Sequence, residues 1–266
     1  MTEASDPQEL LSVATQVAAA AAAMIIERVG EHGLVDTKAN PLDLVTEVDR
    51  ASEELITTRL LDARPNDGVF GEEGANVTGS SGVDWVIDPI DGTTSFVYGL
   101  PGFSVSIAAR QADTIVAGVV HAPMIGAVYQ AAAGHGCTYN QRTATCSDVT
   151  SLDTALIATG FAPDAQRRTR QAGQIAALLP EIRDIRRMGS AALDLAIVAS
   201  GQVDAFYEVG LNPWDYSAGV LLVTEAGGKV IVEPDPASGR AFIAAAAPGI
   251  ADALFGRLRD LGADQV

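Results

Sequence analysis

Cysteine is scarce in this chain, whose 266 residues include only Cys137 and Cys146. Two cysteines are too few for a disulfide framework, and their spacing is not that of a structural zinc site. The sequence therefore predicts a protein of a reducing compartment, for which the cytoplasm is the simplest choice.

Basic residues are also few, because 17 Lys and Arg face 34 Asp and Glu and give a net charge of -17. This balance argues against nucleic acid or an anionic membrane as the main partner. It suits a protein that gathers cations, although solubility is the simpler explanation of the total charge.

The sequence predicts neither a signal peptide nor a membrane span. The apolar run Leu11–Ile26 is preceded by acidic residues, Glu3, Asp6 and Glu9, where a signal peptide carries positive charge. The run is short, rich in alanine and interrupted by polar residues. We expect a packed N-terminal helix and no membrane partner.

The remaining pattern is that of an α/β (α+β) chain without internal repeats or low-complexity linkers. Its length allows one large domain or two halves that share a core, and the polar segment 140–148 predicts halves at 1–145 and 146–266. Apolar spacing predicts helices at 7–29, 49–63, 164–179, 190–200, 215–226 and 249–260. Strands are expected at 85–87, 103–107, 114–120, 126–130, 154–159, 205–208, 229–232 and 242–245, the second to fourth forming a meander.

The most informative stretch is Trp85–Thr94, with the sequence WVIDPIDGTT. Trp85–Ile87 reads as a buried strand, so Asp88 is expected to emerge at its end. Asp88, Asp91 and the Ile90 carbonyl offer hard oxygen ligands to one divalent cation.

A helix start after this stretch would make it a phosphate site. Gly92 lets the backbone approach a ligand closely, and the amides of Gly92, Thr93 and Thr94 would point outward at the positive end of the helix. An ordinary strand, turn and helix with an Asp N-cap is the alternative.

Other acids lie in similar positions along the chain. Glu72 and Glu73 are flanked by glycines just past Val69-Phe70, although a surface turn is an equal explanation. Asp49 follows Thr46 at the start of the second predicted helix, where a capping role explains both residues.

The second half of the chain adds two more acids. Asp215 lies in the first turn of its predicted helix as a cap or a further ligand, and Glu208 ends the preceding strand. Several acids at strand ends and helix starts would repel one another unless a cation neutralised them. Oxygen ligation favours Mg²⁺ or Mn²⁺ over zinc. The histidines lie in no recognisable ligand motif and are expected to be structural or surface residues: His32, His121 and His135.

Three of these segments together, Gly71–Gly74, Trp85–Thr94 and Trp214–Gly228, resemble the inositol monophosphatase family. Arg186–Leu195 and Phe206–Gly210 look like its bacterial inositol-1-phosphatase branch. The resemblance implies a sugar phosphatase-like fold with alternating helix and sheet layers. It also implies a homodimer that depends on two or three Mg²⁺ ions per subunit, with Mn²⁺ as a possible substitute, and that lithium inhibits.

The resemblance also implies roles for matching residues. Glu72, Asp88 and the Ile90 carbonyl would hold one magnesium, and Asp88, Asp91 and Asp215 the second, while a third, weaker ion is associated with Glu72. Asp49 and Thr93 would orient the attacking water, with Glu72 counted in the same catalytic group, and the amides of Gly92 and Thr93 would hold the phosphate. The sugar ring would face Asp91, Gly189, Ser190, Ala191 and Glu208. Lys38 and Glu73 would support the site. Most metal ligands thus fall in 1–145, whereas Asp215 and the ring contacts fall in 146–266.

The chain departs from the family pattern at Ser95, where many relatives have Asn, and at Asn212-Pro213, which differs from the animal enzymes. The expected reaction is hydrolysis of inositol 1-phosphate by a metal-activated water. Fructose 1,6-bisphosphate or adenosine 3′,5′-bisphosphate as the substrate, and a non-catalytic binding role in transcription, remain alternatives.

Overall fold

A computed structural model describes residues 5–29, 35–37 and 44–265. The helices are α1 (Pro7–Ile26), α2 (Glu47–Ala63), α3 (Thr93–Val97), α4 (Ala165–Leu178), α5 (Ala191–Ala199), α6 (Pro213–Glu225) and α7 (Ala251–Asp260). The strands of the first half are β1 (Val35–Thr37), β2 (Leu44–Thr46), β3 (Gly68–Gly71), β4 (Asn76–Val77), β5 (Val83–Asp91), β6 (Ser104–Gln111), β7 (Thr114–Ala122), β8 (Ala127–Ala132), β9 (Cys137–Tyr139) and β10 (Arg142–Ala144). Those of the second half are β11 (Leu156–Thr159), β12 (Asp184–Arg186), β13 (Ala205–Leu211), β14 (Lys229–Pro234) and β15 (Ala241–Ala246).

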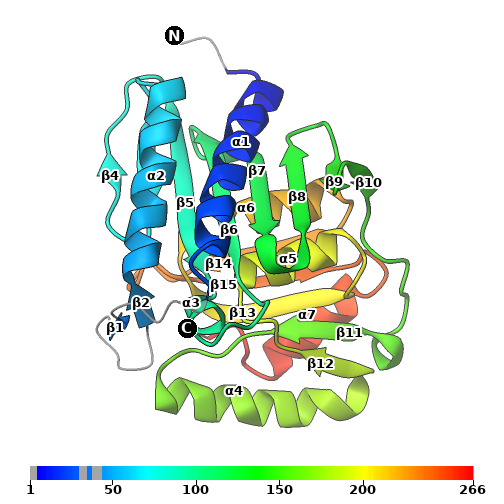
Figure 1. Cartoon of the computed structure of the whole chain (residues 1–266). Coiled ribbons are helices and arrows are strands. Elements are labelled where there is room, and N and C mark those ends of the chain that lie inside the picture. The colour runs from blue at the N-terminus through cyan, green and yellow to red at the C-terminus, as the bar shows by residue number, and fades with distance from the viewer. Residues whose placement is uncertain (1–4, 30–34, 38–43, 266) are drawn as a thin grey trace.

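Helices and sheets alternate in layers. An eight-stranded sheet has the order β10-β9-β8-β7-β6-β5-β3-β4, and a five-stranded sheet has the order β12-β11-β13-β15-β14. Helices α1 and α2 cover one face of the larger sheet, α5 and α6 lie between the two sheets, and α4 and α7 cover the outer face of the smaller one (Figure 1). The expected layered architecture is therefore confirmed.

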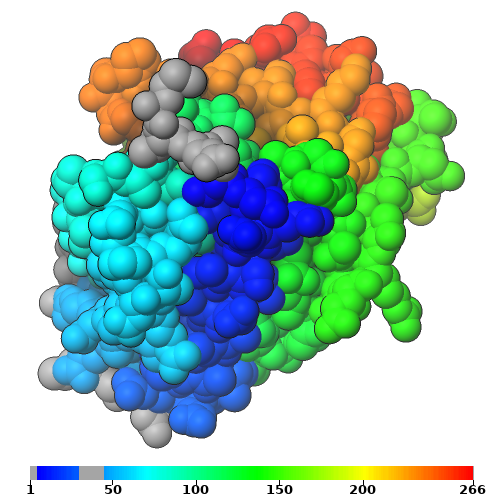
Figure 2. Space-filling view, turned by 90° about the horizontal axis from the view of Figure 1, so that it is seen from above, coloured from blue at the N-terminus to red at the C-terminus, as the bar shows by residue number. Residues whose placement is uncertain are grey.

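Helix α1 is the predicted packed N-terminal helix. Its apolar face, which includes Leu10, Val17 and Ile25, is buried against α2 and strands β6 to β8. Figure 2 shows α1, in dark blue, between light-blue and cyan residues on one side and green residues on the other. Among the described residues, α1 is the one helix that by length and composition could cross a membrane, but its packing is that of a core helix.

Strand β5 carries the most informative stretch, and here the expectation for Asp88 is wrong. Asp88 does not emerge at the strand's end: β5 continues to Asp91, and the Asp88 side chain is only 1% exposed. The pairing with β6 shifts between Asp88 and Asp91. Pro89 has no N–H to donate to the ladder, so the strand bulges there instead of ending.

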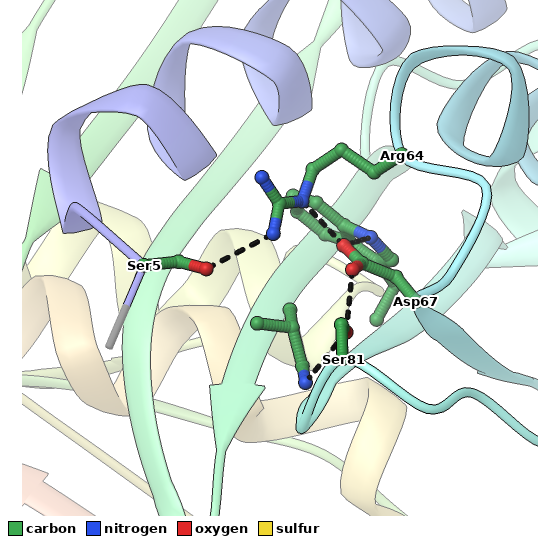
Figure 3. Close-up of polar contacts among 6 residues, drawn as sticks. Ser5, Arg64, Asp67 and Ser81 are labelled. Carbon is green, nitrogen blue, oxygen red and sulfur yellow. Dashed lines mark hydrogen bonds and ion pairs between the residues drawn. The ribbon is translucent and has the colours of Figure 1, made fainter. Parts of the chain in front are cut away.

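A buried polar network anchors the beginning of β5 (Figure 3). The Asp67 carboxylate accepts hydrogen bonds from Trp85 Nε1 at 3.0 Å, Ser81 Oγ at 2.6 Å and Arg64 Nε at 2.5 Å. Arg64 Nη2 also donates to Ser5 Oγ at 3.0 Å, which ties this network to the segment before α1. The indole of the signature tryptophan is thus buried with its donor satisfied.

The predicted meander is present as β6 to β8, each strand antiparallel to the next, and β5 pairs antiparallel with β6. Several boundaries differ: α1 ends at Ile26 rather than at residue 29, β6 extends to Gln111, and β13 extends to Leu211. The short strands β1 to β4, β9, β10 and β12 were not predicted, because runs of two to four residues give too little periodicity. The division at residue 145 stays a prediction.

Candidate active site

Acidic side chains from both halves of the chain meet beside the bulge of β5. Asp88 lies in the sheet, Glu72 follows β3, and Asp215 is in the first turn of α6. Burial raises the pKa of Asp88 well above its ordinary value, and the nearby charges of Glu72, Asp91 and Asp215 raise it further. A hydrogen bond between the Asp88 and Glu72 side chains adds to this rise. The residues predicted as metal ligands therefore act on one another electrostatically.

Asp215 is held by the start of its own helix. Its Oδ2 accepts the Asn212 N–H at 2.6 Å, so Asp215 completes the capping box of α6. Burial raises the pKa of Asp215 well above its ordinary value, and Asp91 and Glu72 add to the rise. The two explanations of Asp215 in the sequence, cap and ligand, are thus compatible.

Asp91 connects β5 to α5. Its Oδ2 accepts hydrogen bonds from Ser190 Oγ at 2.7 Å and from the Ala192 N–H at 2.6 Å. Burial raises the pKa of Asp91 from 3.8 to about 6, although these two bonds and the charge of Arg187 oppose the rise. The predicted ring-facing segment at residues 189–191 is therefore in contact with the predicted metal ligand.

Asp49 serves both as a helix cap and as a neighbour of Thr93. Its Oδ2 accepts the Thr46 N–H at 2.8 Å in the capping box of α2 and also accepts the Thr46 hydroxyl. Its Oδ1 accepts the Thr93 hydroxyl at 3.1 Å, and this hydroxyl also lies 3.2 Å from the Ile90 carbonyl oxygen. Burial is the largest cause of the raised pKa of Asp49. A pair of this kind can accept a proton from a water bound nearby.

Gly92 lies close to the backbone of two other segments, at Gly102 and at Gly189. Its φ is +94°, and a Cβ there would lie 2.7 Å from the Gly102 carbonyl oxygen and 2.9 Å from that of Gly189. Only glycine fits both the conformation and the space. Ser95 is buried, and its Oγ would be 2.6 Å from a Cβ at Gly189.

A cavity of about 130 Å³ lies next to the acids. It is lined by Asp91, Gly160, Arg187, Gly189, Ser190, Ala191, Asp194, Glu208, Leu211 and Asp215. All five predicted ring contacts are among these residues. Burial raises the pKa of Glu208 to about 7, with Arg187 opposing and Asp91 adding to the rise. The wall is mostly polar, as a site for a hydroxylated ligand requires.

The donor set fits a hard divalent cation. It consists of carboxylate and carbonyl oxygens, and the carboxylates destabilise one another's ionised forms. Within the described ranges, no three His, Cys, Asp or Glu side chains are already arranged to hold a metal ion. Asp91 accepts a hydrogen bond from Ser190 at the start of α5, and the Asp88 side chain is hydrogen-bonded to that of Glu72. A bound metal ion would replace these hydrogen bonds or share the same oxygens.

Four predicted residues need separate mention. Lys38 lies outside the described residues, as does His32. The Glu73 backbone N–H donates to Glu53 at 2.7 Å, and the charge of Glu73 contributes to the raised pKa of Asp49. His135 is exposed and contacts Gln8, which agrees with a surface role.

The sequence interpretation missed Glu53, Arg187 and Asp194. Glu53 lies four residues after Asp49 on the same helix, a spacing that could have revealed it. Asp194 is buried, its Oδ1 has no hydrogen-bond partner, and it lines the cavity with Arg187.

The chain is similar to known proteins in both sequence and structure. The model of the inositol monophosphatase family matches residues 6–254. The inositol-1-monophosphatase of Mycobacterium leprae is 43% identical over 96% of this chain and 95% of its own. The Escherichia coli Nus factor SuhB is 38% identical over 94% of this chain and 96% of its own. The structure of Mycobacterium tuberculosis SuhB has a TM-score of 0.86 at 40% identity and covers 98% of this chain and 100% of its own.

Proposed function

Because the chain belongs to the inositol monophosphatase family, we propose that it hydrolyses inositol 1-phosphate to inositol and inorganic phosphate with Mg²⁺ as cofactor. The family is metal-dependent. The observation that carries the proposal is the electrostatic cluster of Glu72, Asp88, Asp91 and Asp215 beside a polar cavity.

In this proposal the cluster holds two cations. Glu72, Asp88 and the Ile90 carbonyl supply the ligands of one, and Asp88, Asp91 and Asp215 those of the other. Bound Mg²⁺ supplies Lewis-acid stabilisation of the phosphate and of the leaving oxygen, and it lowers the pKa of a bound water. A third, weaker ion near Glu72 and inhibition by lithium belong to the same proposal, as do a homodimer and a cytoplasmic location.

The protein's own groups then position the reactants. The water oxygen attacks phosphorus, the bond from phosphorus to the inositol oxygen breaks, and the leaving alkoxide takes up a proton from solvent water. Asp49 accepts the water proton through Thr93, whose hydroxyl contacts it at 3.1 Å. The Gly92 and Thr93 amides bind the phosphate oxygens, because the close backbone packing around Gly92 fixes their direction.

The cavity supplies the preference for a polyol. Asp91, Ser190 and Glu208 line it, and their side chains can exchange hydrogen bonds with ring hydroxyls. Gly189 and Ala191 leave room for the ring because their side chains are absent or small.

There are two alternative functions, and a specific observation favours the second. Another small phosphate ester would use the same acids and differ only in its contacts with the cavity. A non-catalytic role in transcription is favoured by one observation, the 38% identity to a protein named Nus factor SuhB.

The test is phosphate release from inositol 1-phosphate, fructose 1,6-bisphosphate and adenosine 3′,5′-bisphosphate at equal Mg²⁺, with and without lithium. We expect Mg²⁺-dependent, lithium-sensitive release that is fastest on inositol 1-phosphate. Faster release from another ester would replace the substrate. The absence of release from all three, together with rescue of a deletion strain by Asp88→Asn, would favour the binding role.

A further inference from the structure

One face of α2 contacts three separate segments of the candidate site. Asp49, Ser52 and Glu53 are three and four residues apart, so their side chains lie on the same face of the helix. Asp49 contacts Thr93 at the start of α3, and Ser52 Oγ donates to the Pro89 carbonyl oxygen in the bulge of β5 at 3.3 Å.

The third contact is the Glu53 carboxylate with the loop that carries Glu72. Glu53 is 5% exposed. Its Oε2 accepts the Glu73 N–H at 2.7 Å, and its Oε1 accepts the Ala75 N–H at 2.7 Å. Both carboxylate oxygens therefore bind backbone amides of the residues that follow Glu72.

The same loop closes on itself around this carboxylate. The Gly71 N–H donates to the Ala75 carbonyl oxygen at 2.8 Å, which joins the two ends of the loop. A Cβ at Gly71 would lie only 2.3 Å from Glu53 Oε2. The carboxylate thus occupies the space that a side chain at this position would fill.

From these contacts we propose that Glu53 is a positioning residue, which fixes the Gly71–Ala75 loop so that the Glu72 carboxylate faces Asp88. The inference rests on the proposed function in one respect, because it takes Glu72 to be a metal ligand. Glu53 acts through the backbone of the loop. Its loss should weaken metal binding more than it slows the reaction of the fully loaded enzyme.

The decisive experiment is calorimetric titration of Mg²⁺ into EDTA-stripped full-length protein. Glu53→Gln keeps the size of the side chain but places an amide NH₂ where one carboxylate oxygen accepted a backbone N–H. We expect its Kd for Mg²⁺ to rise about 10- to 100-fold, the usual effect of removing a group that orients a metal ligand. The Mg²⁺ concentration for half-maximal phosphate release should rise in parallel, with most of kcat recovered at saturating Mg²⁺.

Glu54→Gln is the matched control, because Glu54 is the next residue of the same helix and is exposed. Its Kd should equal that of the wild type. If Glu53→Gln does not fold, Gly71→Ala tests the same contact. The added methyl group would displace the Glu53 carboxylate from the loop while Glu53 itself stays unchanged. We expect the same loss of Mg²⁺ affinity from Gly71→Ala.

The outcomes separate the two proposals. A wild-type protein that binds Mg²⁺, with a Glu53→Gln variant that binds it equally tightly but unfolds more easily, overturns the positioning role and leaves the proposed function standing. A folded Gly71→Ala variant with unchanged Mg²⁺ affinity overturns it as well. A wild-type protein that binds no Mg²⁺ overturns both.

Discussion

Replacing Asp91 by Asn should stabilise the metal-free protein at neutral and alkaline pH. Asp91 Oδ2 accepts both the Ser190 hydroxyl and the Ala192 N–H. An asparagine that places its carbonyl oxygen at this position keeps both bonds and removes only the charge. The substitution therefore isolates the cost of an ionised carboxylate among other acids.

The magnitude follows from the raised pKa. Burial raises the pKa of Asp91 from 3.8 to about 6, so the folded state binds the proton more tightly than the unfolded state does. The protonated Asp91 carboxyl contributes its full stabilisation when the pH is below its pKa in the unfolded chain. This contribution is lost as the pH rises through about 6, the pKa in the folded protein. One pKa unit corresponds to about 1.4 kcal/mol, so the ionised group costs the folded protein roughly 3 kcal/mol at pH 8.

Urea denaturation in EDTA at pH 5 and pH 8 measures this cost. The free energy of unfolding of Asp91→Asn should exceed that of the wild type by up to about 3 kcal/mol at pH 8 and by about half of that at pH 5. Asp113→Asn, at an exposed position, is the control and should stay within about 0.5 kcal/mol. Added Mg²⁺ should stabilise the wild type far more than Asp91→Asn. A variant that is less stable than the wild type by the same amount at both pH values would refute the reasoning.

Three further substitutions test other contacts. Thr93→Val removes the hydroxyl that contacts Asp49 and should lower kcat about 10²-fold or more with little change in Mg²⁺ affinity by calorimetry, whereas Thr93→Ser should keep most activity. Trp85→Phe removes the bond to buried Asp67 and should cost about 1.5–3 kcal/mol in urea denaturation; unchanged stability would mean that this bond contributes nothing. Gly92→Ala places a methyl group within 3 Å of two carbonyl oxygens at φ +94°. It should lower the free energy of unfolding by more than the roughly 1–2 kcal/mol that the left-handed conformation alone costs, and it should abolish most of the phosphatase activity.

The local elements could be read from the sequence where the signal was strong. Helix α2 starts directly after Thr46, one of its two predicted caps, whereas α6 starts at Pro213, two residues before the predicted position, because Asn212 is its N-cap. The meander follows its alternating apolar residues. The end of β5 could not be read, because the polar character of Asp88 suggests a strand end. Its place in the sheet depends on pairing with β6 and on the bulge that Pro89 requires.

The candidate site was predicted as a set of residue types, but its contacts required the fold. Asp91 and Ser190 are ninety-nine positions apart in the sequence, and Asp91 accepts the Ser190 hydroxyl because the fold brings the start of α5 to the end of β5. Glu53, Arg187 and Asp194 escaped notice for the same reason. Each acts on a segment remote in sequence, and an acid or an arginine on a helix or loop is usually a solvated residue.

The most direct test of the acidic cluster is a crystal structure of the protein soaked in Mn²⁺, with anomalous difference density calculated at the manganese edge. We predict one or more peaks ligated by oxygens of Asp88, Asp91, Asp215 and Glu72. The absence of a peak at this cluster, in crystals of protein that releases phosphate when Mn²⁺ is added in solution, would contradict its role as the metal site.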